Sequence, residues 1–171
     1  LFGDFNPSGK LPVTFYKNTD QLPDFEDYSM KNRTYRYMTE VPLFPFGYGL
    51  SYTTFDISKG RLNKKTISAG QDLKFKVNVK NTGKYDGAEV IQVYVRKVDD
   101  AEGPIKSLRA FRRVPLKAGE TCVVSIDLLP TTFEFFDPTT NTMRIMPGKY
   151  EIMYGNSSDI PSGNKLSVTL R

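Results

Sequence analysis

The sequence contains no histidine and no tryptophan, and it has one cysteine among 171 residues. Without histidine the chain cannot form a Ser-His-Asp triad, a Cys-His dyad or an imidazole-based zinc site. The single cysteine, Cys122, allows no internal disulfide, and its alternating apolar neighbours indicate a small core residue. No apolar run approaches the roughly 18 residues that a membrane-spanning helix needs. These absences exclude much catalytic chemistry, and we expect no cofactor, no metal and no membrane span.

Basic residues outnumber acidic ones, 24 Lys and Arg against 19 Asp and Glu, which gives a net charge of +5. Four of them cluster at Lys106, Arg109, Arg112 and Arg113. The cluster is open to two interpretations, a polyanion-binding patch or a solvated strand face. We favour the strand face and expect no nucleic-acid partner, because no nucleic-acid motif accompanies the charges.

The first 52 residues differ in pattern from the rest. Of the 22 Phe and Tyr residues, 13 lie within the first 55 positions, yet that stretch shows neither strand-like nor helix-like periodicity. Such a segment needs a surface to cover its aromatic side chains. We expect part of that surface in the following domain and the rest in a domain outside this chain. We therefore predict a boundary between residues 1–52 and residues 53–171.

From residue 55 the sequence alternates in short runs between turns. Phe75, Val77 and Val79 share one face of the clearest run, whereas Val90 and Tyr94 are expected to be only partly covered. The expected strands cover residues 74–80, 88–95, 107–114, 121–128, 133–136, 142–146, 149–154 and 166–170. The pattern predicts an all-β, antiparallel β-sandwich of the immunoglobulin or fibronectin type III kind, with a closed barrel as the alternative. The missing cysteine pair and tryptophan argue against a true immunoglobulin domain.

Two prolines and two glycines lie among the aromatic residues of positions 42–55. Proline removes a backbone donor and fixes φ while glycine frees it, so this stretch cannot be a regular helix or a central strand. It predicts a rigid, buried connector between two domains. Its central residues are Pro45, Phe46, Gly47, Tyr48, Gly49, Leu50, Ser51 and Tyr52.

An ordered set of motifs extends over nearly the whole chain, at residues 2–15, 32–37, 45–52, 87–95, 108–111, 119–120 and 147–150. The set resembles family 3 glycoside hydrolases, in which a fibronectin type III-like domain follows the second α/β domain. Residues 2–15 are similar to the G-x-x-N-P-S-G-K/R-L-P-x-T-F segment of that α/β domain. Residues 32–37 are similar to the form in β-xylosidase-like members, with β-glucosidases as the second choice.

The resemblance implies a secreted or periplasmic retaining enzyme that removes β-linked sugars from non-reducing ends. Its nucleophile and its acid/base would lie upstream of this chain, within catalytic domains of the same polypeptide, so no catalytic residue is assigned here. The start at Leu1, without an initiator methionine or signal sequence, fits an internal fragment. The chain itself would then be a structural domain. A carbohydrate-binding module and a protein-interaction domain are the alternatives.

Asp24, Glu26 and Asp27 offer carboxyl groups beside Phe25 and Tyr28. A glycosidase needs two carboxyl groups held across a sugar, and this proline-containing loop lacks a rigid scaffold. We expect a loop that packs its aromatic side chains and exposes its acids. Asp99, Asp100 and Glu102 match no calcium loop, and we interpret them as a hairpin tip.

Arg33, Tyr35, Arg36 and Tyr37 are the candidate substrate-binding residues. Arginine donates hydrogen bonds to hydroxyl groups, and tyrosine rings stack on sugar faces. The alternative, which we favour, is that these residues dock against the missing α/β domain.

Overall fold

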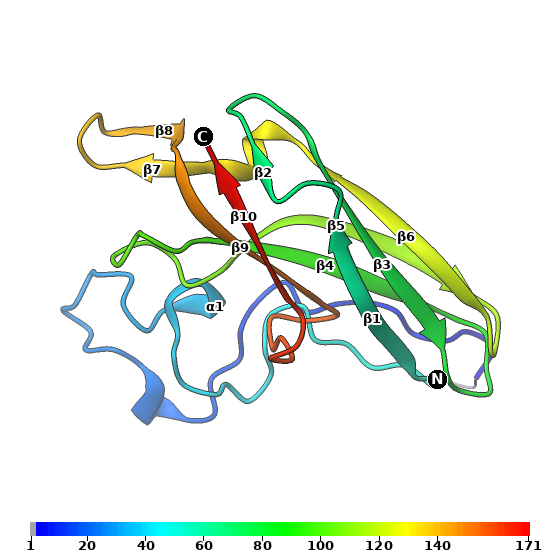
Figure 1. Cartoon of the computed structure of the whole chain (residues 1–171). Coiled ribbons are helices and arrows are strands. Elements are labelled where there is room, and N and C mark those ends of the chain that lie inside the picture. The colour runs from blue at the N-terminus through cyan, green and yellow to red at the C-terminus, as the bar shows by residue number, and fades with distance from the viewer. Residues whose placement is uncertain (1–2) are drawn as a thin grey trace.

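The computed structural model describes residues 3–171 and consists of two packed sheets, a hairpin and a long N-terminal segment (Figure 1). The three-stranded sheet has the order β1-β3-β6, with β1 (Phe55–Leu62), β3 (Leu73–Asn81) and β6 (Thr121–Leu128). The five-stranded sheet has the order β2-β10-β9-β4-β5, with β2 (Thr66–Ile67), β10 (Lys165–Leu170), β9 (Gly148–Gly155), β4 (Gly87–Lys97) and β5 (Ser107–Leu116). This arrangement confirms the predicted fibronectin type III-like sandwich.

Smaller elements complete the chain. β7 (Glu134–Asp137) and β8 (Thr142–Ile145) form a separate antiparallel hairpin. Two 3₁₀ turns, η1 (Thr19–Gln21) and η2 (Pro130–Phe133), and one helical turn, α1 (Thr34–Tyr37), lie outside the sheets. Phe133 was expected in a strand, but it ends η2, because Pro130 at the first turn position favours a helical φ.

The core lies between the two sheets and follows the predicted alternation. Phe75, Val77 and Val79 of β3 are fully buried, and they face Ile91 and Val93 of β4 within one apolar cluster. β6 continues the layer, with Val77 opposite Val124 in register. Burying each such side chain stabilises the fold by about 1.5–3 kcal/mol.

Sequence periodicity missed β1, and the structure shows why. The register between β1 and β3 shifts between Ser58 and Arg61, and Lys59 within the shift has a φ of 54°. Such a bulge breaks the alternation of side chains along the strand. Gly60 lies against the ring of Tyr154, where a Cβ atom would come within 2.4 Å of the ring carbons.

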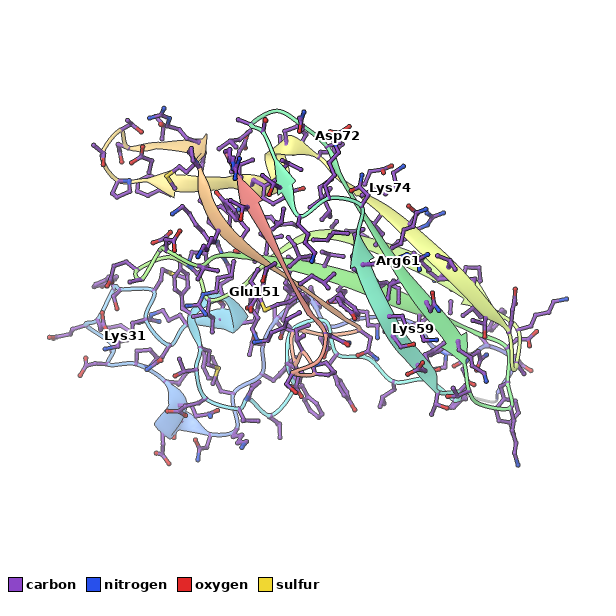
Figure 2. The ribbon with its side chains drawn as sticks, in the orientation of Figure 1. Lys31, Lys59, Arg61, Asp72, Lys74 and Glu151 are labelled. Atoms are coloured by element: carbon purple, nitrogen blue, oxygen red, sulfur yellow. The ribbon has the colours of Figure 1, made fainter. Side chains whose placement is uncertain are left out.

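The outer faces of the two sheets differ. Lys59, Arg61 and Lys74 project from the outer face of the three-stranded sheet, which is charged and open to solvent (Figure 2). The N-terminal segment runs along the other side of the molecule, against the five-stranded sheet (Figure 1). Tyr94, expected to be partly covered, is therefore fully buried although it lies on the outer face of β4.

Candidate functional site

The N-terminal segment is attached to the sandwich by a cluster of aromatic rings. Tyr35 stacks on Phe46 with ring centroids 4.2 Å apart, and its edge meets Tyr94 at 5.8 Å. The backbone N–H of Leu108 donates to the Tyr35 hydroxyl at 3.1 Å. Burial, with a smaller contribution from Tyr35, raises the pKa of Tyr94 far above its usual value. Tyr94 is therefore a neutral donor, bonded to Gln92 Oε1 at 2.6 Å.

Gln92 fastens the connector to the sheet. Its side-chain amide is buried and donates to the carbonyl oxygens of Gly47 at 3.1 Å and Asn156 at 2.7 Å. Gly47 has a φ of 78°, and a Cβ atom there would lie 2.1 Å from Gln92 Oε1. Only glycine adopts this φ without strain and also leaves room for the Gln92 side chain, which explains the first glycine of the connector.

A buried ion pair forms the second attachment. Lys10 Nζ lies 2.6 Å from Glu89 Oε1, and the two side chains are 15% and 7% exposed. Glu89 also accepts hydrogen bonds from Val90 N–H at 2.7 Å and Asn156 Nδ2 at 3.0 Å. Removing one member of such a pair leaves a buried charge without compensation, so the pair fixes Lys10 on the sheet.

Asn6 provides the third attachment. Its Oδ1 accepts from Ser51 Oγ at 3.0 Å and from Tyr52 N–H at 2.9 Å, while its Nδ2 donates to the carbonyl of Asp86 at 3.0 Å. Thr53 Oγ1 then donates to the buried Asn81 side chain at 2.7 Å. The start of the segment, the connector and the loop before β4 are thereby held together.

The opposite side of the segment is apolar and open. We define the apolar face as Leu11, Phe15, Phe44, Tyr48 and Leu50, which line one shallow groove. Phe15 and Phe44 contact edge to face at 6.2 Å, and Phe44 and Tyr48 lie 5.3 Å apart. Phe15, Phe44 and Leu50 expose 44%, 40% and 70% of their surface. Within this chain the connector is thus buried on one side only, and its burial between two domains stays a prediction.

The four candidate substrate-binding residues do not converge on one cavity. Tyr35 is engaged with the sandwich and reaches a mixed-charge groove of about 560 Å³ beside β4 and β9. Arg33 donates to the carbonyl oxygens of Ser29 and Asp27 within its own loop. The Arg36 guanidinium lies 5.7 Å from the ring centre of Tyr37. Sugar binding by these residues stays a prediction.

The acidic loop exposes its aromatic side chains, contrary to expectation. Phe25 and Tyr28 are 92% and 89% exposed, because nothing within residues 3–171 covers them. Asp24 and Asp27 accept the backbone N–H groups of Glu26 and Ser29. The Ser29 hydrogen bonds lower the pKa of Asp27, whereas a glycosidase acid needs a raised one.

Other charged clusters belong to local structure. Asp100 accepts Gly103 N–H and Asp99 accepts Lys149 N–H, as hairpin residues do. Among residues 3–171, no group of three or more Asp, Glu, His or Cys side chains lies close enough to hold a metal ion. Within the same residues, no helix has the length and apolar character needed to cross a membrane.

The four basic residues of the 106–113 cluster have separate partners. Lys106 donates to the carbonyl of Ser158, and Arg109 to that of Glu134. Arg112 donates to the Ser125 carbonyl, and Arg113 donates to the Ser8 hydroxyl. The four side chains therefore contact different elements.

The attachments that sequence reasoning missed carry one detectable signal. Glu89 and Gln92 are polar residues within an otherwise apolar strand, and both are buried. Polar groups in that position need partners, which here include Lys10 and Gly47, far earlier in the chain, and Asn156, far later.

Comparisons with known proteins agree with this two-part organisation. Residues 1–52 match the glycosyl hydrolase family 3 C-terminal domain, and residues 89–158 match the fibronectin type III-like domain. A xylan 1,4-β-xylosidase of Xylanibacter ruminicola is 54% identical over 99% of this chain and 19% of the relative. A periplasmic β-glucosidase of Salmonella typhimurium is 37% identical over 92% of this chain and 22% of the relative.

Solved structures show the same arrangement. A β-glucosidase of Erythrobacter marinus superposes with a TM-score of 0.82 at 37% identity, covering 99% of this chain and 22% of that one. The chain thus spans about a fifth of the length of the relatives it matches. Both family models match, in the expected order along the sequence, and a relative matches nearly the whole chain. The chain therefore belongs to glycoside hydrolase family 3 and corresponds to its C-terminal region with the fibronectin type III-like domain.

Proposed function

We propose that this chain is the non-catalytic C-terminal part of a secreted or periplasmic, retaining, exo-acting β-glycosidase. The enzyme removes terminal β-linked sugars from plant-type oligosaccharides, with β-xylosides preferred and β-glucosides second. The 54% identity to a relative named as a β-xylosidase supports the first choice, and the 37% identity to one named as a periplasmic β-glucosidase supports the second and the compartment. The function of the chain is to buttress the catalytic domains of the same polypeptide.

The two-sided packing of residues 3–52 carries this proposal. One side is fixed to the sandwich through Tyr35, Gln92 and the Lys10–Glu89 pair. The other side presents the apolar face, where burial of the surface still exposed would add about 25 cal/mol per Å² of apolar area. An exposed cluster of large apolar side chains of this kind is typical of an interaction site. Its occupant in this proposal is the upstream catalytic part of the polypeptide.

The chemistry of the chain supports a structural role. The exposed acids of the Asp24–Asp27 loop accept local backbone hydrogen bonds, and the pKa of Asp27 is lowered. A retaining glycosidase instead needs two carboxyl groups about 5–5.5 Å apart, one of them with a raised pKa. The resemblance to family 3 enzymes implies that the nucleophile and the acid/base lie in the upstream domains, and the proposal places them there.

Hydrolysis assays test whether catalysis belongs to the upstream domains and not to this chain. The full-length protein should hydrolyse aryl β-xylosides and, more slowly, aryl β-glucosides, while the 171-residue chain should hydrolyse neither at high concentration. Inactivity of the full-length protein on both substrates would contradict the assignment. Turnover by the chain, lost on changing Asp24, Glu26 or Asp27, would show that the chain carries its own site.

A pair of substitutions tests the buttress in the full-length enzyme. Phe15→Asp with Phe44→Asp places two charges on the apolar face and should shorten the half-life of activity on heating. Phe111→Asp is the matched control, because Phe111 is 68% exposed on β5 of the sandwich. Equal half-lives for the double variant and the control would contradict the proposed contact.

A further inference from the structure

An unusual backbone positions α1 against the sandwich. Asn32 and Thr34 have φ values of 57° and 54°, in the left-handed region that a β-branched residue such as threonine rarely adopts. A residue in this conformation is strained, and it persists where the surroundings hold it. Here the Ile105 N–H donates to the Arg36 carbonyl at 2.8 Å, which places α1 beside the start of β5.

A β-bulge places a second arginine at the same end of β5. Val93 pairs with Ala110 and Tyr94 with Leu108, so Arg109 is the additional residue between them. Its guanidinium lies 4.9 Å from the ring centre of Phe135, and one of its terminal nitrogens donates to the Glu134 carbonyl. Bulges of this kind redirect a side chain at a sheet edge.

The two arginines are left with unused donors. The Nε–H groups of Arg36 and Arg109 are both buried and have no hydrogen-bond partner within residues 3–171. The hydroxyl of Ser107, two residues before Arg109 and 5% exposed, is also buried without a partner. Buried donors are normally paired, and each one left unpaired destabilises the folded state.

The charges of this pair are also uncompensated. No ion pair within residues 3–171 includes Arg36 or Arg109. Burial, followed by the positive charge of Arg36, lowers the pKa of Arg109. Two guanidinium groups that repel each other and retain buried donors are complementary to an anion with two acceptor oxygens.

We propose that Arg36 and Arg109 form a binding site for a carboxylate that comes from outside this chain. The carboxylate would accept both Nε–H groups and neutralise the arginine pair. Arg36 belongs to the segment that matches the family 3 C-terminal domain, and Arg109 belongs to the sandwich. A bound carboxylate would therefore join the two parts. The inference does not depend on the proposed buttress role.

The test uses the arginine side-chain Nε–H resonances of the 171-residue chain. Sodium acetate and sodium glucuronate are titrated against sodium chloride at constant ionic strength, with xylose as the uncharged sugar control. The Nε–H signals of Arg36 and Arg109 should shift saturably with both carboxylates and remain unchanged with xylose. Arg113 serves as an internal control because its Nε already donates to Ser8.

The relative affinities identify the source of the carboxylate. Equal affinities for acetate and glucuronate indicate an Asp or Glu side chain, whereas glucuronate binding at least 10-fold tighter indicates an acidic sugar. Arg109→Gln and Arg36→Gln should weaken binding at least 10-fold, and Arg113→Gln should not. Arg109→Lys keeps the charge but loses the planar guanidinium donors, so an intermediate loss is expected.

Unchanged Nε–H signals for both arginines in the unmodified chain would overturn the proposal, whatever the folding of the variants. Signals that shift equally in Arg113 would overturn it as well. Neither result bears on the proposed function. The titrations measure anion binding to the 171-residue chain, whereas the proposed function is tested by hydrolysis and by the heat stability of the full-length enzyme.

Discussion

The sandwich and the N-terminal segment handle their apolar side chains in opposite ways. In the sandwich, Phe75 and Tyr150 are fully buried, whereas Phe5 and Phe25 of the segment are about nine-tenths exposed, at 88% and 92%. Nineteen large hydrophobic side chains are exposed among residues 3–171, and twelve of them lie within residues 3–52. A periodic sequence buries its apolar residues within its own fold. A sequence rich in aromatic residues but without periodicity depends on surfaces that other parts of the protein supply.

Truncation of a core ring should have the largest effect on stability. Phe75→Ala should lower the free energy of unfolding by about 3–5 kcal/mol, because a large buried side chain is replaced by a cavity. Phe25→Ala in the segment should change it by less than about 0.5 kcal/mol in the 171-residue chain. Chemical denaturation measures both. A comparable loss for Phe25→Ala would break the distinction between the two regions.

Removal of one partner of the buried ion pair should have the next largest effect. Lys10→Met leaves Glu89 buried and unpaired, which should cost about 3 kcal/mol. Lys165→Met is the matched control, since Lys165 lies 3.8 Å from Glu151 and is 45% exposed, and it should cost less than about 1 kcal/mol. Equal costs in denaturation would show that Lys10 contributes little to the attachment of the segment.

Substitution of the connector glycine should have a smaller effect. Gly119→Ala introduces a Cβ at a φ of 77° into open space and should cost about 1–2 kcal/mol. Gly47→Ala has nearly the same φ of 78° but also meets the Gln92 side chain. It should be the more destabilising of the two. An equal loss of stability for the two variants in thermal unfolding would show that the Gln92 side chain moves away from the new Cβ without cost.

The pH dependence of stability should sharpen the description of the core. Burial raises the pKa of Tyr150 to about 12, while its hydroxyl donates to the Met146 carbonyl at 2.6 Å. The folded state therefore retains a proton that the unfolded state loses near pH 10, so stability is complete below pH 10 and falls toward pH 12. Tyr150→Phe should weaken this fall. An unchanged slope in the variant would assign the fall to other groups.

The sequence predicted the elements whose evidence is local. The alternation of residues 74–80 was enough to predict β3 and its buried face, and β4, β6 and β9 followed in the same way. β1 was missed because a bulge at Lys59 interrupts its alternation. Local patterns describe a strand only where its side chains alternate without interruption.

The attachments between the two regions could not be predicted in the same way. Tyr94 packs against Tyr35, which lies about 60 residues earlier in the chain and stacks on Phe46. Glu89 depends on Lys10. The candidate residues of the 33–37 motif were identified from sequence, but their separate roles became visible only in the folded chain. Arg33 holds its own loop, Tyr35 contacts the sandwich, and Arg36 has a buried Nε–H without a partner within residues 3–171.

Hydroxyl-radical footprinting of the full-length enzyme and of the 171-residue chain tests the central claim most directly. Phe15 and Phe44 of the apolar face should be oxidised in the chain and protected in the full-length enzyme. Phe111 on β5 and Phe136 on the β7–β8 hairpin, which are 68% and 52% exposed, should be oxidised equally in both. Equal oxidation of Phe15 and Phe44 in the two proteins would contradict the account, because the segment would then have no partner on its open side.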